Sequence, residues 1–330
     1  MLENTANRLT KIFLLVSVLS IVCMNAFAQS YPDRPLKIVV SYGPGGGSDI
    51  QARLIGQNIS DRLKQPVLVE NKPGGNGVIG MRAAATSKPD GYTLYWGSSD
   101  HVIMGPNTFS NYPFDPLKDF VPVSIISSQP YLIVVPSSVP ARTLAEFIAL
   151  AKSRPGQLNF GSTGTGGLAH LAGEVMQKVT GIKMVHVPFK GAAEANAGLI
   201  GDQVQLQFAG IATITPLVKS GAVRVIGVTS PERLVAYPDL PTMTEAGFPD
   251  LVISSWNGIF LPAGTPQEIV NAVYGGVAHA LRQKETLDRL SGLGLQTTNA
   301  TPAEFSSFVK NELEKWNKNV RSIGMEKHPM

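Results

Sequence analysis

Cysteine is almost absent from this chain of 330 residues, which contains only one. A single cysteine excludes a disulfide-stapled scaffold and any zinc or iron–sulfur site built from cysteine ligands. Charged residues make up 16% of the chain and hydrophobic residues 43%, so the sequence is too apolar to be disordered. The length is sufficient for two domains.

Clusters of basic residues are also missing. Lys and Arg total 28 against 24 Asp and Glu, which gives a net charge of +4, and the basic side chains are scattered along the sequence. Proteins that bind nucleic acids usually gather Lys and Arg on one surface or along one helix. The charge pattern therefore predicts no nucleic-acid partner.

No apolar run is long enough to span a bilayer comfortably, and the run near the N-terminus is typical of a signal peptide. Arg8 and Lys11 precede apolar residues at 12–22, and the A-x-A pattern at 26–28 predicts cleavage before Gln29. An uncleaved anchor is the alternative. Removal of residues 1–28 is expected to leave a soluble protein outside the cytoplasmic membrane that has no cysteine, because Cys23 leaves with the signal.

Short strands alternate with glycine-rich loops and amphipathic helices. The strands expected before residue 130 lie at 36–41, 67–69 and 92–96, and those after it at 131–135, 158–160, 184–187, 204–208 and 223–228. Helical spacing of apolar residues dominates the C-terminal part. This alternation predicts an α/β protein with parallel strands, right-handed crossovers and a ligand cleft between two domains.

Helix starts are marked by capping residues. Thr-x-x-Glu segments at 143–146, 265–268 and 301–304 predict three capping boxes, two of them with Pro at the first helical position. After the first glycine loop, Ser48 or Asp49 is expected to cap the helix. We predict that Asp49 orders this loop without contacting a bound carboxylate, and that Asp49→Asn preserves the fold.

Three glycine loops, at 43–47, 73–77 and 161–167, follow predicted strands and open helices. Such loops present free N–H groups and the positive end of a helix dipole, and so suit phosphate or carboxylate. Each one is also consistent with a simple tight turn. None matches the P-loop or the G-x-G-x-x-G dinucleotide fingerprint, so no nucleotide cofactor is predicted.

Catalytic and metal-binding patterns are poor. The sequence contains neither a G-x-S-x-G elbow nor an H-E-x-x-H motif. His170 and Glu174 share a helix face but lack a third metal ligand, and His170 either bonds a ligand or packs. Residues 98–101 are consistent with pocket lining or a turn. We predict no catalysis, metal or cofactor; a secreted α/β enzyme acting on a phosphorylated or anionic small molecule is the alternative.

Six segments together resemble the receptors of tripartite tricarboxylate transporters, also called Bug-type solute-binding proteins. The segment SYGPGGGSDIQAR at 41–53 resembles P-[FY]-x-P-G-G-x-x-D-x-x-A-R, and VENKPGGNGVIG at 69–80 resembles V-E-N-[RK]-P-G-[AG]-G-G-x-I-G. The remaining matches are KPDGYTL at 88–94, HVPFKG at 186–191, YPDLPTMTEAG at 237–247 and LPAGTP at 261–266. They occur in order over nearly all of the chain after the signal.

The resemblance implies a type II periplasmic-binding-protein fold with two crossover strands, at 128–131 and 253–257. Domain 1 comprises 29–130 and 254–330, and domain 2 comprises 131–253. The implied function is capture of a small carboxylate by cleft closure, with permease subunits of the transporter as possible partners. The ligand-binding residues that the resemblance implies are Tyr42, Gly43, Gly45, Gly46, Gly47, Gly74, Gly75, Asn76, Gly77, Ser162, Thr163, Gly164, Thr165, Phe189, Lys190 and Gly191. His170 is added to this prediction because it lies near the start of the helix after the third glycine loop.

The chain departs from the family pattern at three points. Ser41 stands where Pro is usual, Asn76 adds an amide to the second loop, and Gln205 replaces an acid. Citrate-like acids, dicarboxylates, amino acids and aromatic acids all remain open as ligands.

Overall fold

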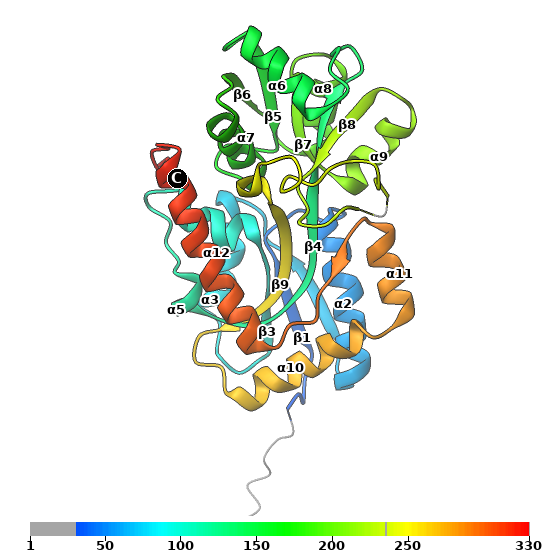
Figure 1. The fold of residues 1–330 in the computed structure, drawn as a ribbon. Coiled ribbons are helices and arrows are strands. Elements are labelled where there is room, and N and C mark those ends of the chain that lie inside the picture. Colours follow the sequence, from blue (N-terminus) through cyan, green and yellow to red (C-terminus); the bar gives the residue numbers. More distant parts are fainter. Residues whose placement is uncertain (1–30, 235, 330) are drawn as a thin grey trace, which may run out of the picture.

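The computed structural model describes residues 31–234 and 236–329. The predicted signal peptide, including Cys23, lies outside the described residues. Two lobes are visible in Figure 1, joined by long strands that run from one lobe into the other. The strands are β1 (Leu36–Val40), β2 (Val67–Asn71), β3 (Thr93–Ser98), β4 (Phe120–Pro136), β5 (Leu158–Ser162), β6 (Met184–Pro188), β7 (Leu206–Gly210), β8 (Val223–Val228), β9 (Ser254–Pro262) and β10 (Gln296–Thr297).

The strand order is β2-β1-β3-β9-β4-β7-β5-β6, with β8 and β10 also paired to β4. Strands β1, β2 and β3 run parallel in one lobe, and β5, β6 and β7 run parallel in the other. Parallel strands need crossover connections, and helices supply them here. The predicted βαβ pattern is confirmed in both lobes, although β7 begins two residues later than expected.

Strand β4 changes partners part-way along its length. It pairs with β9 up to Pro130, and with β7 and β8 from Tyr131 onward. The returning chain changes in the same way, because the N–H of Ile253 donates to Thr229 while Ser254 begins the pairing of β9 with β4. Both changes fall within the segments expected to be crossovers.

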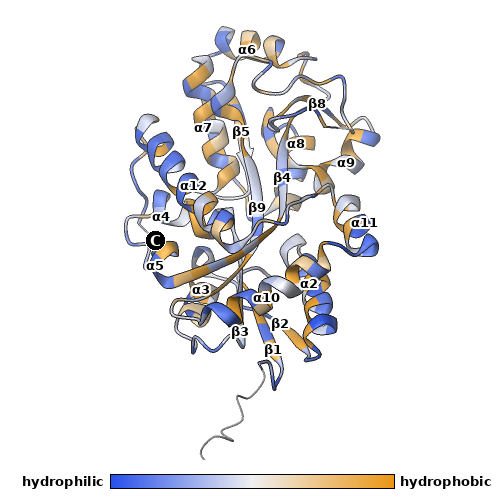
Figure 2. Ribbon diagram, turned by 60° about the horizontal axis from the view of Figure 1, so that its bottom comes forward, coloured by the Kyte–Doolittle hydropathy of each residue, from blue (hydrophilic) through white to orange (hydrophobic). Residues whose placement is uncertain are grey.

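Helices cover the sheet in both lobes, and most carry hydrophobic and hydrophilic residues together, as Figure 2 shows. Such helices bury one face against the sheet and leave the other in water. Their bounds are α2 (Gly47–Leu63), α3 (Val78–Ala85), α4 (Gly105–Thr108), α5 (Pro116–Asp119), α6 (Leu144–Ser153), α7 (Leu168–Thr180), α8 (Ala192–Ile200), α9 (Ile211–Lys219), α10 (Gln267–Ala280), α11 (Lys284–Gly292) and α12 (Pro302–Ser322), with short helical turns η1 (Gly75–Gly77), η2 (Asp100–Met104) and η3 (Pro249–Leu251).

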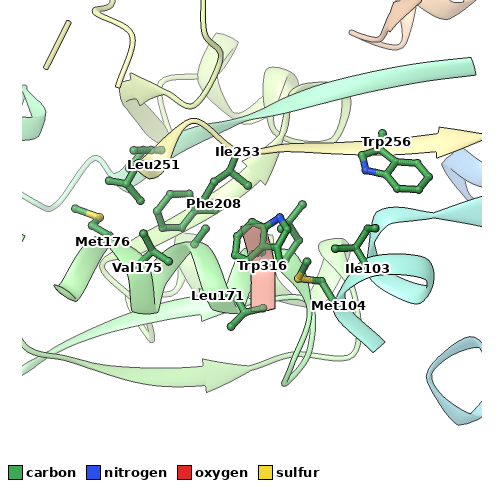
Figure 3. Packing of buried hydrophobic residues seen from close by; sticks show 14 of the residues in the cluster. Ile103, Met104, Leu171, Val175, Met176, Phe208, Leu251, Ile253, Trp256 and Trp316 are labelled. Carbon is green, nitrogen blue, oxygen red and sulfur yellow. The ribbon is translucent and has the colours of Figure 1, made fainter. Parts of the chain in front are cut away.

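One hydrophobic cluster extends across both lobes. Trp316 of α12 is 1% exposed and lies among Met104 of η2 and Leu171 and Val175 of α7, as Figure 3 shows. Ile253 at the crossover belongs to the same cluster. The lobes are therefore packed together on this side, next to the crossover strands. None of the helices in the described residues has the length and hydropathy needed to cross a membrane.

The capping predictions have mixed outcomes. Thr301 and Glu304 form the full capping box expected at α12. Thr143 accepts from the N–H of Glu146, but the carboxylate of Glu146 accepts from Arg142 instead of Thr143. The box expected at 265–268 is wrong. Pro266 is itself the residue before α10, and the Thr265 hydroxyl donates to the carbonyl of Pro262.

Candidate functional site

The predicted ligand-binding residues lie where strands end and helices begin. Tyr42, Gly43, Gly45, Gly46 and Gly47 follow β1, and Gly74, Gly75, Asn76 and Gly77 follow β2. In the other lobe, Ser162, Thr163, Gly164 and Thr165 follow β5, His170 lies in α7, and Phe189, Lys190 and Gly191 follow β6. In parallel sheets, ligands bind beyond these carboxyl ends of the strands.

The helices that start at this edge share an unusual N-terminus. Helices α2, α3, α7, α8 and α9 each begin after a glycine, which has no side chain to cap the helix that follows it. Asp115, Thr143 and Thr301 cap helices α5, α6 and α12, whereas α4, α10 and α11 lack a side-chain cap but do not begin after a glycine. Uncapped first-turn N–H groups carry partial positive charge and attract anions. The strand edge is therefore suited to a carboxylate.

The loops before α2 and α7 have the same local structure. Gly46 and Gly167 precede the helices with φ/ψ of −77°/167° and −78°/168°. Gly45 and Gly166 both have φ of +79°, a conformation that strains any residue with a Cβ. In each loop the N–H of this glycine donates to a side chain four residues later, from Gly45 to Asp49 and from Gly166 to His170.

Asp49 lies in the first turn of α2, so its predicted role as helix cap is wrong. The residue before the helix is Gly46, and the Asp49 side chain is 4% exposed. Its Oδ2 accepts from the N–H of Gly45 at 2.9 Å and from Arg53 Nε at 3.1 Å, and its Oδ1 accepts from Asn71 Nδ2 at 2.9 Å. Burial alone would raise the pKa of Asp49, but these hydrogen bonds outweigh it and lower the pKa. Asp49 thus fixes the loop from behind.

Asp100 forms a contact between the lobes. It stands after β3 at the start of η2, and its Oδ1 accepts from the N–H of Leu168 at 3.0 Å. Leu168 is the first residue of α7, in the same position as Gly47 at the start of α2. The glycine loop of the second lobe therefore already holds a carboxylate, supplied by the chain itself. The equivalent N–H of Gly47 has no acceptor within the described residues.

Aromatic residues surround Asp100. The hydroxyl of Tyr42 donates to Asp100 Oδ2 at 3.4 Å and lies 2.9 Å from Ser98 Oγ. Burial raises the pKa values of Tyr42 and Tyr131, and the nearby charge of Asp100 raises them further. Burial lowers the pKa of His101, although Asp100 opposes that shift. Both hydroxyls and the imidazole are consequently neutral at neutral pH.

The second glycine loop packs against the same residues. Gly77 has φ of +87°, and the ring of His101 occupies the space that a Cβ at this position would need. His101 also stacks on Tyr42, with the ring centroids 4.6 Å apart. The two loops of the first lobe are therefore held together through His101. Gly74, Gly75 and Asn76 remain exposed.

Two predicted residues of the second lobe support its loops. His170 is 5% exposed, and its Nδ1 accepts from Gly166 at 3.1 Å, so it orders the loop before α7. Phe189 lies against Gly161 and Gly198, where a Cβ would meet its ring. Thr163, Thr165 and Lys190 are exposed, and the N–H of Lys190 donates to Glu194 at 2.8 Å.

Among the described residues, Ser162 and His186 form a serine–histidine contact that resembles a catalytic pair. The Oγ of Ser162 lies 2.6 Å from His186 Nε2. Burial first, and then the charges of His170 and His328, lower the pKa of His186 to about 4, which makes this imidazole a weak base. Activation of a serine needs a base whose pKa lies near the working pH. Within the described residues no group of three His, Cys, Asp or Glu side chains is placed to hold a metal.

The sequence predicted the positions of Asp100 and Asn257 only in part, and it did not predict their contacts. Asp100 was expected only within a segment that lines a pocket or forms a turn. Asn257 lies in the expected crossover, where its Oδ1 accepts from Ser48 Oγ and Trp96 Nε1, both at 3.2 Å. The repeat G-x-G-G at 43–46 and 164–167 is the sequence signal that relates the two loops.

Comparison with known proteins decides the family. The profile of the tripartite tricarboxylate transporter family receptor (TctC) matches residues 51–325. The protein BugT of Bordetella pertussis is 33% identical over 298 residues, which cover 90% of this chain and 91% of BugT. The chain belongs to this receptor family. The family predicted from the sequence is therefore confirmed. Its members are receptors that serve a transporter.

Two solved structures confirm the two-domain fold of this family receptor. The periplasmic binding protein BugD has a TM-score of 0.79 at 29% identity, covering 90% of this chain and all of that one. The Rpa4515 protein of R. palustris, solved with adipate, has a TM-score of 0.81 at 30% identity, covering 91% and 100%. The predicted periplasmic-binding-protein fold is therefore correct.

Proposed function

We propose that this receptor captures a small carboxylate in the periplasm, between a first domain (29–130 and 254–330) and a second (131–253). Membership of the tripartite tricarboxylate transporter receptors supports a role in uptake, and the adipate in the Rpa4515 structure supports a carboxylate. The bound receptor would then deliver its ligand to the permease subunits of such a transporter.

The contact between Asp100 and Leu168 is the observation that carries this proposal. It shows a carboxylate oxygen 3.0 Å from the first N–H of a helix that follows this type of glycine loop. The loop before α2 has the same backbone conformation, and its first N–H has no acceptor in the described chain. We assign the ligand carboxylate to this loop, at the N–H groups of Gly47 and Ser48, with Gly74 to Gly77 beside it.

Enclosure of the ligand would come from the second lobe. Thr163 and Thr165 are exposed in the loop between β5 and α7 of the second lobe. Leu168, whose N–H donates to Asp100, belongs to the same lobe. The change of partners at Pro130 and Tyr131 and at Ile253 and Ser254 gives two hinge points. Saturating ligand should then change the small-angle scattering curve toward a more compact particle. Identical curves with and without ligand would contradict closure.

The experiment for carboxylate capture uses Gly46→Val. Gly46 has a negative φ, and a Cβ there meets only the carbonyl oxygen of Gly43 at 3.6 Å, so the backbone accepts a side chain here. The side chain of Val would then block approach to the helix start. A panel of mono-, di- and tricarboxylates is titrated by calorimetry and by thermal unfolding. A ligand at 100 times its Kd stabilises the wild-type protein by about 2.7 kcal/mol.

Gly46→Val should abolish the response to the best ligand while leaving unfolding without ligand within about 1 kcal/mol of wild type. Gly292→Val is the matched control, because Gly292 also has open space and a non-positive φ but lies in α11. Retained affinity in Gly46→Val would overturn the assignment of the loop. Absence of binding by every carboxylate in the panel would overturn the function itself.

A further inference from the structure

The two equivalent glycine loops differ in electrostatic surroundings. In the first lobe, Asp49 directs both carboxylate oxygens toward Gly45, Arg53 and Asn71, behind the loop. At the equivalent loop of the second lobe, the carboxylate of Asp100, which comes from the first lobe, accepts from the first N–H of α7. One loop therefore offers free N–H groups to a ligand, and the other presents a negative charge beside it.

Within the described residues, the Asp100 carboxylate has no ion-pair partner. Among residues 31–234 and 236–329, no lysine, arginine or histidine nitrogen lies within 4.0 Å of the Asp100 carboxylate. Its hydrogen-bond donors are the N–H of Leu168 and the hydroxyl of Tyr42. Its neighbours Tyr131 and His101 are neutral at neutral pH, as shown above. A carboxylate in such a partly enclosed place is stabilised strongly by an added positive charge.

We propose that Asp100 determines specificity, so that this receptor selects ligands with a carboxylate at one end and a protonated amine at the other. This inference rests on the proposed function, because it places the ligand carboxylate on the loop before α2. Because Asp100 accepts from the first N–H of α7, a ligand that reaches from the loop before α2 to the loop before α7 would bring its opposite end beside Asp100. A protonated amine there gains an ion pair, whereas a second carboxylate is repelled.

Other charged groups on the loops do not reverse this preference. Lys190 follows β6, the strand at the end of the sheet order, and its side chain is exposed to water, which screens its charge. Glu194 accepts from the N–H of Lys190 on the same loop. The charge of Asp100, which accepts from Leu168 of the second lobe, therefore decides the preference at the glycine loops.

The test compares ligands that differ in one end group only. Succinate and 4-aminobutanoate form one pair, and adipate and 6-aminohexanoate form a longer pair; each is titrated by calorimetry into wild-type protein and Asp100→Asn. Asparagine keeps an oxygen that can accept from Leu168 but removes the charge. Asp61→Asn is the control for net charge, because Asp61 is exposed on α2 and bonds only Gln57.

The wild-type protein should bind the amino acid of at least one pair more tightly than its dicarboxylate. Asp100→Asn should shift the affinity ratio of that pair toward the dicarboxylate by about tenfold or more, and Asp61→Asn should leave it unchanged. An unchanged ratio in Asp100→Asn, or a wild-type preference for the dicarboxylate in both pairs, overturns the role of Asp100 while leaving carboxylate capture intact. If no carboxylate binds any of the three proteins, the proposed function fails and this inference fails with it.

Discussion

The strongest stability prediction concerns Asp49, whose two oxygens accept from different donors. Oδ2 accepts from Gly45 and Arg53, and Oδ1 lies 2.9 Å from both Asn71 Nδ2 and Arg53 Nη2. In Asp49→Asn, one oxygen becomes an NH₂ group that faces donors, whichever way the amide turns. The variant should therefore keep the fold, as predicted from the sequence, but lose stability.

The magnitude follows from the bonds that are lost. Hydrogen bonds to charged groups contribute about 1.5–3 kcal/mol each, and Asp49→Asn sacrifices those on one oxygen. Arg53 is 52% exposed and can turn to water, which reduces the loss. We expect Asp49→Asn to lower the free energy of unfolding by about 2–3 kcal/mol at pH 7.

The pH dependence gives an independent check. The folded-state pKa of Asp49 is lowered, so its stabilisation is present above the unfolded pKa of about 4 and is lost as pH falls through the folded pKa. Urea unfolding at pH 7 and at pH 3 should therefore show a smaller difference between the two proteins in acid. Asp61→Asn, on the same helix, should stay within about 0.5 kcal/mol of wild type. Equal stabilities of Asp49→Asn and wild type at pH 7 would refute the reasoning.

Three further predictions test the supporting structure. Gly80→Ala should lower the free energy of unfolding in urea by about 2 kcal/mol, because its Cβ would collide with Ser41 Oγ and lie 3.1 Å from the carbonyl oxygen of Lys72; wild-type stability would disprove this packing. Thr301→Ala should cost about 1 kcal/mol in the same assay through loss of the capping box, and an unchanged midpoint would argue against it. His186 should titrate by NMR near pH 4, because its folded pKa is lowered; the stability that its neutral form gives is present above about pH 6.5 and is lost toward pH 4. A midpoint above pH 6 would contradict its burial.

The sequence predicted the strand–loop–helix order well because these elements depend on local signals. β-branched runs produce β1 and β8, and the glycine loops are followed by helices as expected. Residues Gly45 and Gly166 need a positive φ, so glycine at these positions is itself a structural signal. Local patterns of this kind require no knowledge of the distant parts of the chain.

Contacts between distant segments were not predictable in the same way. Asp100 and Leu168 are 68 positions apart and meet only because the two lobes pack together. The role of Asp49 was misjudged by a shift of three residues in the helix start, from Asp49 itself to Gly46. With this shift, the expected helix cap becomes a buried acceptor. One of its donors, Asn71, lies on β2, so this role of Asp49 depends on a contact with a distant segment.

The contrast between capped and uncapped helices gives a physical reason for coupling ligand binding to stability. A side-chain cap contributes about 1 kcal/mol to a helix, and α6 and α12 have one, whereas α2 and α3 at the glycine loops do not. A serine or aspartate in place of Gly46 would satisfy the free N–H groups of α2 permanently and would compete with the ligand for them. Glycine leaves those groups to water in the empty receptor, and a carboxylate that replaces the water supplies the missing acceptor. The second lobe shows the alternative outcome, because Asp100 provides that acceptor at α7 and leaves the first lobe as the place for the ligand's own carboxylate.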